Sequence, residues 1–355
     1  MIRNKKTALS KEGATTTLLH EGKEEENFLP RVLAFVFPQF HRDSLNDRLW
    51  AEGFTDWDSL RKAPEKNRLG FKIPRPTELG YYNYSDTEPR RKQGELANQY
   101  GIDGLIFHHY WFYDEAHPGP NLHEPVINML KDGYPDVPSL CIGVLAGALK
   151  VLKKLRELAK LDGFPGMYFT VGLTKPHEHL LEIEDEEIVT VTKRQEQRVF
   201  CFQLFDKVVS YPNPSDWSKG RSLEIPSWCA DNIDGGDNNK VKRAKEIAGI
   251  ISSFDNTPRR NYEEANLFAT GEPDEVVELF RKSLDAALYY EACCFPDVNN
   301  RSPKDRKQDD RFILINAMNE WAEGMALEPS DVYGRKFLET IRDTKDAISK
   351  SRCSR

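Results

Sequence analysis

Two glutamates lie three positions apart around a tryptophan in the stretch "NAMNEWAEG", residues 316–324. They are Glu320 and Glu323, and Trp321 follows the first of them. In a helical segment, residues three apart share a face, so the two carboxylates would converge. Glycoside chemistry uses such a pair, with one carboxyl group as proton donor and the other as base or nucleophile. An adjacent indole would raise the pKa of one carboxyl by desolvation and offer a platform for a sugar ring.

The same stretch also has a purely structural interpretation. Asn319 could cap a helix that begins at Glu320, where the helix dipole favours an acidic side chain. This interpretation accounts for one carboxylate and leaves Glu323 and an exposed Trp321 unexplained. Spacing alone leaves the catalytic and the structural interpretations open.

Further polar and aromatic clusters could complete a site. The stretch "HHYWFYDEAHPGPNLH" includes His109, Tyr110 and Trp111, which suit either a core or sugar stacking. Its histidines lack the HxxxH or HExxH spacing of a metal pair borne by a helix, so no metal is predicted. The stretch "FPQFHRDSLNDRLWAEGFTDWDSL" is a long loop, and such loops are often functional. It supplies Gln39, His41, Asp56 and Trp57.

The stretch "DNTPRR" supplies Asp255, Arg259 and Arg260. Two interpretations of it stay open. It is either a turn with solvated arginines or a clamp for an anion or a hydroxyl group.

These clusters need elements that bring them together. Apolar runs predict strands at 32–37, 103–110, 139–145, 166–173, 247–255 and 311–316, with a further strand near 199–204. Amphipathic patterns predict helices at 88–101, 123–133, 148–163, 273–292 and 333–348. This alternation implies parallel βαβ units. The clusters follow the carboxyl ends of different strands, which is where a (β/α)8 barrel builds its active site.

Composition limits the alternatives. The chain has 355 residues, 39% hydrophobic and 30% charged, with a net charge of −7. This is a globular composition without a basic stripe, so no nucleic-acid partner is expected. No run reaches the ~18 apolar residues of a membrane span. No GxGxxG or Walker A stretch follows a strand, which disfavours a nucleotide-dependent enzyme on an open sheet.

The chain is predicted to form one domain over residues 29–348, with an irregular segment at 173–247. Residues 1–28 and 349–355 are interpreted as tails. The first of these lacks the apolar core of a signal peptide, so a cytoplasmic or otherwise intracellular location is expected. The six cysteines form no CxxC pair and are expected to be reduced thiols.

Four long motifs together carry a family resemblance. They are "FPQFHRDSLNDRLWAEGFTDWDSL", "RPTELGYYNYSDTEPRRKQGELANQYGIDGLIFHHYWF", "FDNTPRR" and "NAMNEWAEGMALEPSDVYGRKFLETIR". In this order they resemble the WbsX-type family, whose members are called glycosyltransferases of polysaccharide biosynthesis and are related to endo-α-mannosidase-like glycoside hydrolases. The resemblance covers residues 31–145 and 248–345. It implies a (β/α)8 barrel that acts on a glycan or glycoconjugate without a metal or other cofactor.

The resemblance also implies roles for single residues. Glu320 corresponds to the base and Glu323 to the general acid of a retaining reaction, in which the base deprotonates the sugar's own 2-hydroxyl to give an epoxide-like intermediate. The candidate substrate-binding residues are Gln39, His41, Asp56, Trp57, His109, Tyr110, Trp111, Asp255, Asn319 and Trp321.

The chain departs from the family pattern in its middle. The predicted strand at 139–145 runs almost directly into the helix at 148–163, so a rim module of the family is missing. The count of about seven strands agrees with this, and we expect a barrel that is incomplete or distorted between residues 145 and 205. The expected function is hydrolysis or transfer of glycosyl units. The alternative is a glycan-binding pseudoenzyme, which would bind without turnover.

Overall fold

The computed structural model describes residues 29–112, 119–132, 140–145, 161, 170–173, 207–210, 246–294 and 311–351. The predicted tail at 1–28 lies outside these ranges. So do most of the segment 173–247 and all of the predicted helix 148–163 except Leu161.

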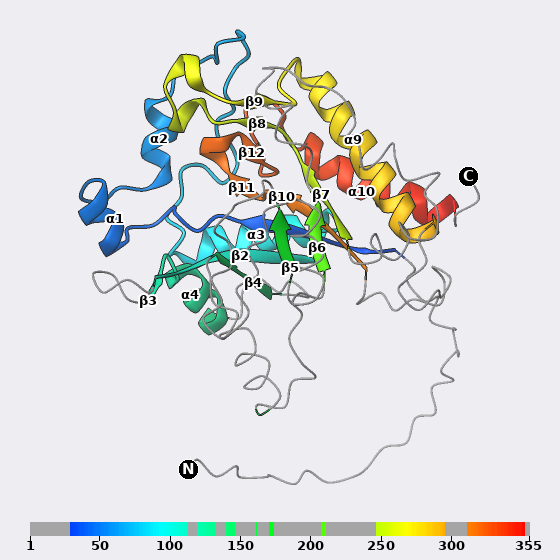
Figure 1. The fold of residues 1–355 in the computed structure, drawn as a ribbon, viewed down its shortest axis with the longest axis horizontal. Coiled ribbons are helices and arrows are strands. Elements are labelled where there is room, and N and C mark those ends of the chain that lie inside the picture. Colours follow the sequence, from blue (N-terminus) through cyan, green and yellow to red (C-terminus); the bar gives the residue numbers. More distant parts are fainter. Residues whose placement is uncertain are drawn as a thin grey trace, which may run out of the picture.

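A parallel sheet organises the described part of the chain (Figure 1). On one side of β1 (Arg31–Val36) lie β2 (Gly104–Phe112) and then β4 (Leu140–Leu145). On the other side lie β10 (Phe312–Asn316), β7 (Glu246–Ile251), β6 (Lys207–Ser210) and β5 (Thr170–Leu173). The short β3 (Gly119–Asn121) pairs antiparallel with the end of β2. The predicted α/β class with a parallel sheet is therefore confirmed.

Strand β1 pairs with β2, the strand that follows it in the chain, and also with β10, the last parallel strand of the chain. The first and last parallel strands are therefore neighbours in the sheet. A doubly wound sheet instead reverses its strand order at a switch point. Among the strands that the structure describes, no pairing joins β4 to β5. The chain between them lies almost wholly outside the described ranges, so the distortion expected between residues 145 and 205 stays a prediction.

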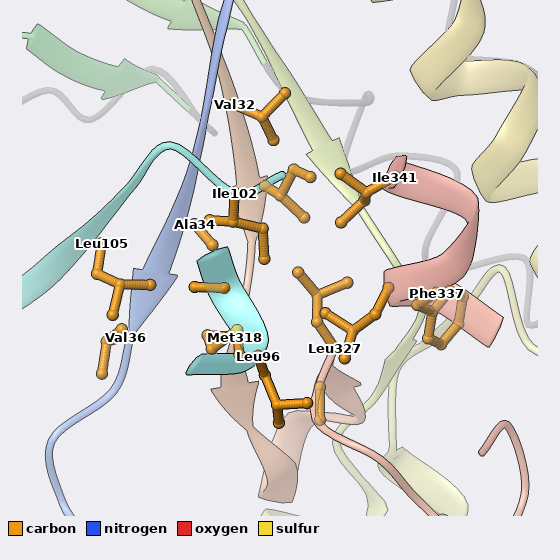
Figure 2. Packing of buried hydrophobic residues seen from close by; sticks show 14 of the residues in the cluster. Val32, Ala34, Val36, Leu96, Ile102, Leu105, Met318, Leu327, Phe337 and Ile341 are labelled. Atoms are coloured by element: carbon orange, nitrogen blue, oxygen red, sulfur yellow. The ribbon is translucent and has the colours of Figure 1, made fainter. Parts of the chain in front are cut away.

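The central strands β1, β2 and β10 bury side chains on both faces, as parallel strands between helices do. In β1, Val32, Ala34 and Val36 belong to the core that packs against the helices (Figure 2). The alternate residue Leu33 packs on the opposite face with Ile106 and Leu314. This period of two is why the apolar run at 32–37 forms a strand.

In the described part of the chain, four helices of nine or more residues cover the outer face. They are α3 (Thr87–Gln99), α4 (Glu124–Asp132), α9 (Pro273–Tyr289) and α10 (Lys336–Ser351). Helices α9 and α10 pack side by side (Figure 1), and α9 continues into a π-helical turn, η4 (Tyr290–Cys294). Helix α10 ends three residues inside the expected C-terminal tail. Cys293 is disulfide-bonded, so the expectation of reduced thiols is wrong there. No described helix is long and apolar enough to cross a membrane.

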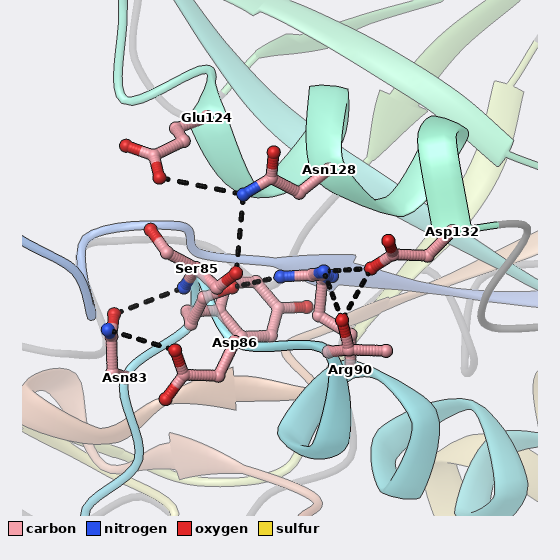
Figure 3. A network of polar contacts seen from close by, with 9 residues as sticks. Asn83, Ser85, Asp86, Arg90, Glu124, Asn128 and Asp132 are labelled. Atoms are coloured by element: carbon pink, nitrogen blue, oxygen red, sulfur yellow. Dashed lines mark hydrogen bonds and ion pairs between the residues drawn. The ribbon is translucent and has the colours of Figure 1, made fainter.

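A polar network fixes the loop before α3 to two helices (Figure 3). The buried guanidinium of Arg90 donates to the backbone oxygen of Tyr84 at 2.9 Å and forms an ion pair with Asp132 of α4. Asn128, also in α4, donates to the backbone oxygen of Ser85 at 3.2 Å. The loop is therefore held from both sides, and it carries Tyr82, which reaches the candidate site.

Short elements cover the carboxyl ends of the strands. Helices α1 (Ser44–Leu49) and α2 (Asp56–Lys62) follow β1. The pair β8 (Phe254–Asp255) and β9 (Leu267–Phe268) follows β7 and encloses the turns η2 (Thr257–Arg259) and η3 (Tyr262–Glu264). The pair β11 (Asn319–Glu320) and β12 (Met325–Ala326) follows β10 and encloses the turn η7 (Trp321–Glu323).

Candidate active site

The two glutamates lie on a hairpin, not on an α-helix. Glu320 pairs with Met325 across β11 and β12, and Glu323 ends the 3-10 turn η7. Gly324 then adopts a left-handed conformation with φ +70°. The helix that was one interpretation of this stretch does not form, because the antiparallel pairing takes Asn319 and Glu320 out of helical geometry. The two side chains nevertheless converge, because a third group draws them together.

That group is Arg259, at the end of η2. Its Nη1 lies 3.3 Å from Glu320 Oε1 and 2.7 Å from Glu323 Oε1. Its Nε and Nη2 donate to the two oxygens of Asp56 at 3.1 and 2.9 Å. We call Asp56, Arg259, Glu320 and Glu323 the charge cluster. The "DNTPRR" turn was expected to hold solvated arginines or a clamp for an external group, but Arg259 pairs with the protein's own carboxylates.

Local structure positions both Asp56 and Arg259. A capping box between Thr55 and Asp58 starts α2 and places Asp56 in its first turn. Asp255 starts η2, because its Oδ1 accepts a hydrogen bond from the backbone of Thr257 at 3.0 Å and its Oδ2 accepts one from Asn67 at 2.9 Å. Arg259 is therefore held at a defined place above the sheet.

The charge cluster contains three carboxylates and one guanidinium. Burial raises the pKa of Glu320 and, together with the charge of Glu320, raises the pKa of Glu323 to about 7. The charge of Arg259 opposes both shifts. The Glu323 side chain is 25% exposed and that of Glu320 is 11% exposed, so Glu323 is the better placed to exchange a proton with solvent.

Three of the predicted binding residues lie beneath the charge cluster. Trp321 was expected to be exposed but is 2% exposed, because its indole N–H donates to Glu328 at 2.8 Å. Trp57 is equally buried and donates to the backbone oxygen of Tyr82 at 2.7 Å. Asn319 is fully buried, and its amide exchanges two hydrogen bonds with the backbone of Phe37. These side chains support the floor of the site.

Strand β2 brings Tyr110 and His108 to the charge cluster. Burial raises the pKa of Tyr110, and the charges of Glu320 and Glu323 add to this shift. The ring of His108 stacks on Phe35 with centroids 5.2 Å apart. Burial lowers the pKa of His108 to about 4, although Glu323 acts to raise it.

His108 was missed as a site residue. The signal that could have found it is the strand period of two. Leu105 and Phe107 belong to the core on the helix side, so positions 106, 108 and 110 share the other face. The side chains of the predicted His109 and Trp111 lie outside the described part of the chain.

Gln39 and His41 make hydrogen bonds within the loop after β1 and to the start of α2. The backbone oxygen of Gln39 accepts a hydrogen bond from the backbone N–H of Asp56 at 2.9 Å. The Nδ1 atom of the buried His41 lies 2.8 Å from the backbone oxygen of Pro38. The charged groups acting on His41 belong to Glu124, Asp43 and His123, not to the charge cluster. Within the described ranges, no group of three or more His, Cys, Asp or Glu side chains could hold a metal ion.

A family model matches most of the chain. The model of the family described as "Glycosyltransferase WbsX" matches residues 32–143 and 144–341. The protein named "Uncharacterized protein WxcX" of Xanthomonas campestris pv. campestris (strain B100) is 25% identical over 399 residues, which cover 96% of this chain and 53% of that protein. Its counterpart in strain ATCC 33913 matches equally. The chain thus spans about half the length of these curated relatives.

Solved structures of glycoside hydrolases are more distant. The endo-α-mannosidase GH99 of Bacteroides thetaiotaomicron is 14% identical in its complex with BIS-TRIS-propane, covering 92% of this chain and 99% of that chain with a TM-score of 0.48. A "glycoside hydrolase-like protein" is 13% identical, covering 90% of this chain and 95% of that chain with a TM-score of 0.47. TM-scores below 0.5 are too low to assign a shared fold.

Proposed function

The chain belongs to the WbsX glycosyltransferase family, and from this premise we propose that Glu320 and Glu323 are the reacting carboxyl groups of a site that cleaves or transfers glycosyl units. The observation that carries the proposal is the charge cluster. It holds two glutamates together on the rim of the sheet and leaves one of them, Glu323, with a pKa of about 7. A carboxyl group that keeps its proton near neutral pH is what a general acid requires.

The spacing of the pair supports a retaining reaction. Because the same Nη1 atom of Arg259 contacts both carboxylates, the two contacted oxygens are at most about 6 Å apart, below the ~6.5–9.5 Å of inverting pairs and compatible with the ~5–5.5 Å of retaining pairs.

In the proposed first step, Glu320 takes the proton of the sugar's 2-hydroxyl as that oxygen bonds to the anomeric carbon. Glu323 gives its proton to the departing glycosidic oxygen. In the second step, water or a sugar hydroxyl attacks the anomeric carbon and loses its proton to Glu323. The bond between that carbon and the 2-oxygen breaks, and Glu320 returns a proton to the 2-oxygen. Water gives hydrolysis and a sugar gives transfer, so both outcomes use the same pair.

One observation favours a second candidate, a glycan-binding protein without turnover. Arg259 forms ion pairs with both glutamates at once. If Arg259 keeps these contacts when a glycan is bound, one oxygen of each glutamate stays occupied by the guanidinium, which opposes proton transfer between these carboxyl groups and the glycan. Binding of a mannose oligosaccharide without any product would support this candidate.

Single substitutions test the assignment of acid and base. Glu323→Gln should reduce turnover of an unactivated mannose oligosaccharide far more than turnover of an aryl α-mannoside whose leaving group is an acidic phenol. Only the leaving group of the oligosaccharide needs a proton donor. Glu320→Gln should abolish turnover of both. Glu263→Gln, an exposed glutamate beyond η2, is the matched control. Equal losses on both substrates for Glu323→Gln, or full activity of Glu320→Gln, would contradict the roles.

The pH dependence of the wild type gives an independent test. The acid is lost as the pH rises through its pKa, so kcat/KM for the unactivated substrate should fall above about pH 7. With the activated aryl substrate, this alkaline decline should be absent.

A further inference from the structure

A third glutamate, Glu328, is buried behind Trp321 and is 1% exposed. It lies two residues beyond β12 and takes no part in the proposed chemistry. Its Oε1 accepts a hydrogen bond from Gln93 at 2.7 Å, and its Oε2 accepts one from the indole of Trp321 at 2.8 Å. The hydroxyl of Tyr82 lies 3.1 and 3.2 Å from the two oxygens. A buried carboxylate is costly unless its oxygens are satisfied, and here three neutral groups satisfy them.

The two nearest partners can only donate. An indole N–H has no acceptor atom, and the amide nitrogen of Gln93 has none either. Each therefore requires its own acceptor oxygen on residue 328. The amide oxygen of Gln93 is already used, because it accepts a hydrogen bond from the hydroxyl of Tyr84 at 2.5 Å. Only a carboxylate offers two acceptor oxygens at this position, so these contacts specify Glu328 chemically.

The partners of Glu328 surround the proposed reacting pair. Trp321 lies between Glu320 and Glu323 in the sequence. Asn319, just before the pair, donates to the hydroxyl of Tyr82 at 3.0 Å and to the backbone oxygen of Phe37 at 3.0 Å. At the other end, Gln93 is fully buried in α3. The network therefore connects the hairpin that carries both glutamates to a helix on the outer face of the sheet.

We propose that Glu328 is a positioning residue, which holds the indole of Trp321 and so fixes the turn between Glu320 and Glu323. This inference rests on the proposed function, because it assigns Glu328 to the same reaction. The turn η7 is only three residues long. A rotation of Trp321 therefore moves the carboxyl groups on both sides, and displacements of about 1 Å reduce rates by up to about 10²-fold.

Glu328→Gln tests the inference because glutamine has the same size. Its amide group must present N–H atoms to either Gln93 or Trp321, so one donor faces another donor. The expected result is a fall in kcat of about 10- to 100-fold with little change in KM. Asp103→Asn is the control, since Asp103 accepts hydrogen bonds from Val32 and Lys345 in a part of the fold outside the network. It should lower the thermal midpoint and leave kcat unchanged.

An exchange of the two side chains distinguishes positioning from general damage. In the double variant Gln93→Glu with Glu328→Gln, residue 328 donates to the new carboxylate and its oxygen again accepts from Trp321. This variant should recover most of the lost kcat. Failure of the exchange to recover any activity, in a protein with a wild-type thermal midpoint, would overturn the inference.

A coupling cycle with Trp321→Phe gives a second criterion. Phenylalanine removes the N–H that Glu328 accepts, so the double variant Trp321→Phe with Glu328→Gln should lose no more activity than the worse single variant. Multiplicative losses would show that the two residues act independently and would contradict the proposed positioning.

Failure of the proposed function gives a different result. If the wild type turns over no glycan, that proposal fails, and the inference is then tested on the indole N–H resonance of Trp321, identified by its loss in Trp321→Phe. Glu328→Gln should shift this resonance and speed its exchange with water. An unchanged resonance would reject the role of Glu328, whatever the activity.

Discussion

At the scale of the residue, Arg259 decides how protons are distributed in the site. Three carboxylates share one guanidinium, so the cluster carries excess negative charge. Close carboxylates do not all ionise easily, and the pKa of at least one rises. Arg259 opposes the upward shifts of Glu320 and Glu323. It therefore helps Glu320 stay ionised as a base, while Glu323, the more exposed of the two, holds the proton.

Removing the guanidinium should shift the pH dependence of the reaction. In Arg259→Gln, the pKa values of both glutamates should rise further, because an opposite charge nearby lowers a carboxyl pKa by about 1–3 units. Both limbs of the kcat/KM profile should then move to higher pH. Arg260→Gln is the matched control, since Arg260 is the exposed neighbour. An unchanged pH profile of kcat/KM in Arg259→Gln would contradict this role.

The sequence was most informative about the residues of the pair. The spacing around Trp321 and the aspartate of the first loop are visible in the motifs, and these residues do converge in the structure. Glu328 was not found, because in "MALEPSD" a single acid beside a proline looks like any surface turn. Its role depends on partners 235 and 246 positions away, Gln93 and Tyr82, and no local pattern records such contacts.

At the scale of the element, the hairpin β11–β12 is held against the neighbouring loop by a glycine. Gly324 has φ +70°, and a Cβ atom there would lie 2.9 Å from the backbone nitrogen of Asp255. Ser253 also donates to the backbone oxygen of Gly324 at 2.5 Å. A helix over this stretch, one of the interpretations that its spacing left open, does not form, because such contacts hold the hairpin β11–β12 against Asp255 of β8.

Two glycine substitutions should separate backbone strain from contact. Gly334 has φ +55° with no atom within 4 Å of a built Cβ. Gly334→Ala should therefore lose about 1–2 kcal/mol of unfolding free energy from strain alone. Gly324→Ala should lose about 1–3 kcal/mol more, because the added methyl group overpacks against Asp255. Urea unfolding measures both, and equal losses would show that the contact with Asp255 is not tight.

At the scale of the whole molecule, several strands were predictable from the sequence, and the pairing between them was not. Runs of alternating or continuous apolar residues predicted β1, β2, β7 and β10 within a few residues. The same patterns do not indicate which strands become neighbours in the sheet. The pairing of β1 with β10 depends on the packing of the complete chain.

The stability of the whole molecule should depend on pH through His108. Its pKa is about 4 in the folded chain and 6.5 in its ordinary state, so between these values the unfolded chain binds a proton that the folded chain does not. The contribution of His108 to wild-type stability should therefore fall as the pH decreases from 6.5 to 4, while the raised pKa of Glu323 acts in the opposite direction. Relative to His108→Gln, the loss should reach about 1–3 kcal/mol.

Chemical denaturation at several pH values measures this difference. Between pH 7 and 8 the gap between wild type and His108→Gln should stay constant, which provides the internal control. A constant gap down to pH 4 would show that the pKa of His108 does not differ between the folded and the unfolded chain.

The adjacency of β1 and β10 also determines when the site can form during synthesis. Phe37 and Asn319, which exchange hydrogen bonds beneath the proposed pair, are 282 positions apart. A ribosome that adds about 5–20 residues per second needs on the order of 15–60 s to make the chain between them. During that interval β1 has β2 available but lacks β10, so one edge of β1 is free to pair with other chains. A nascent chain released before β10 therefore lacks both glutamates of the proposed pair and the strand that protects this edge.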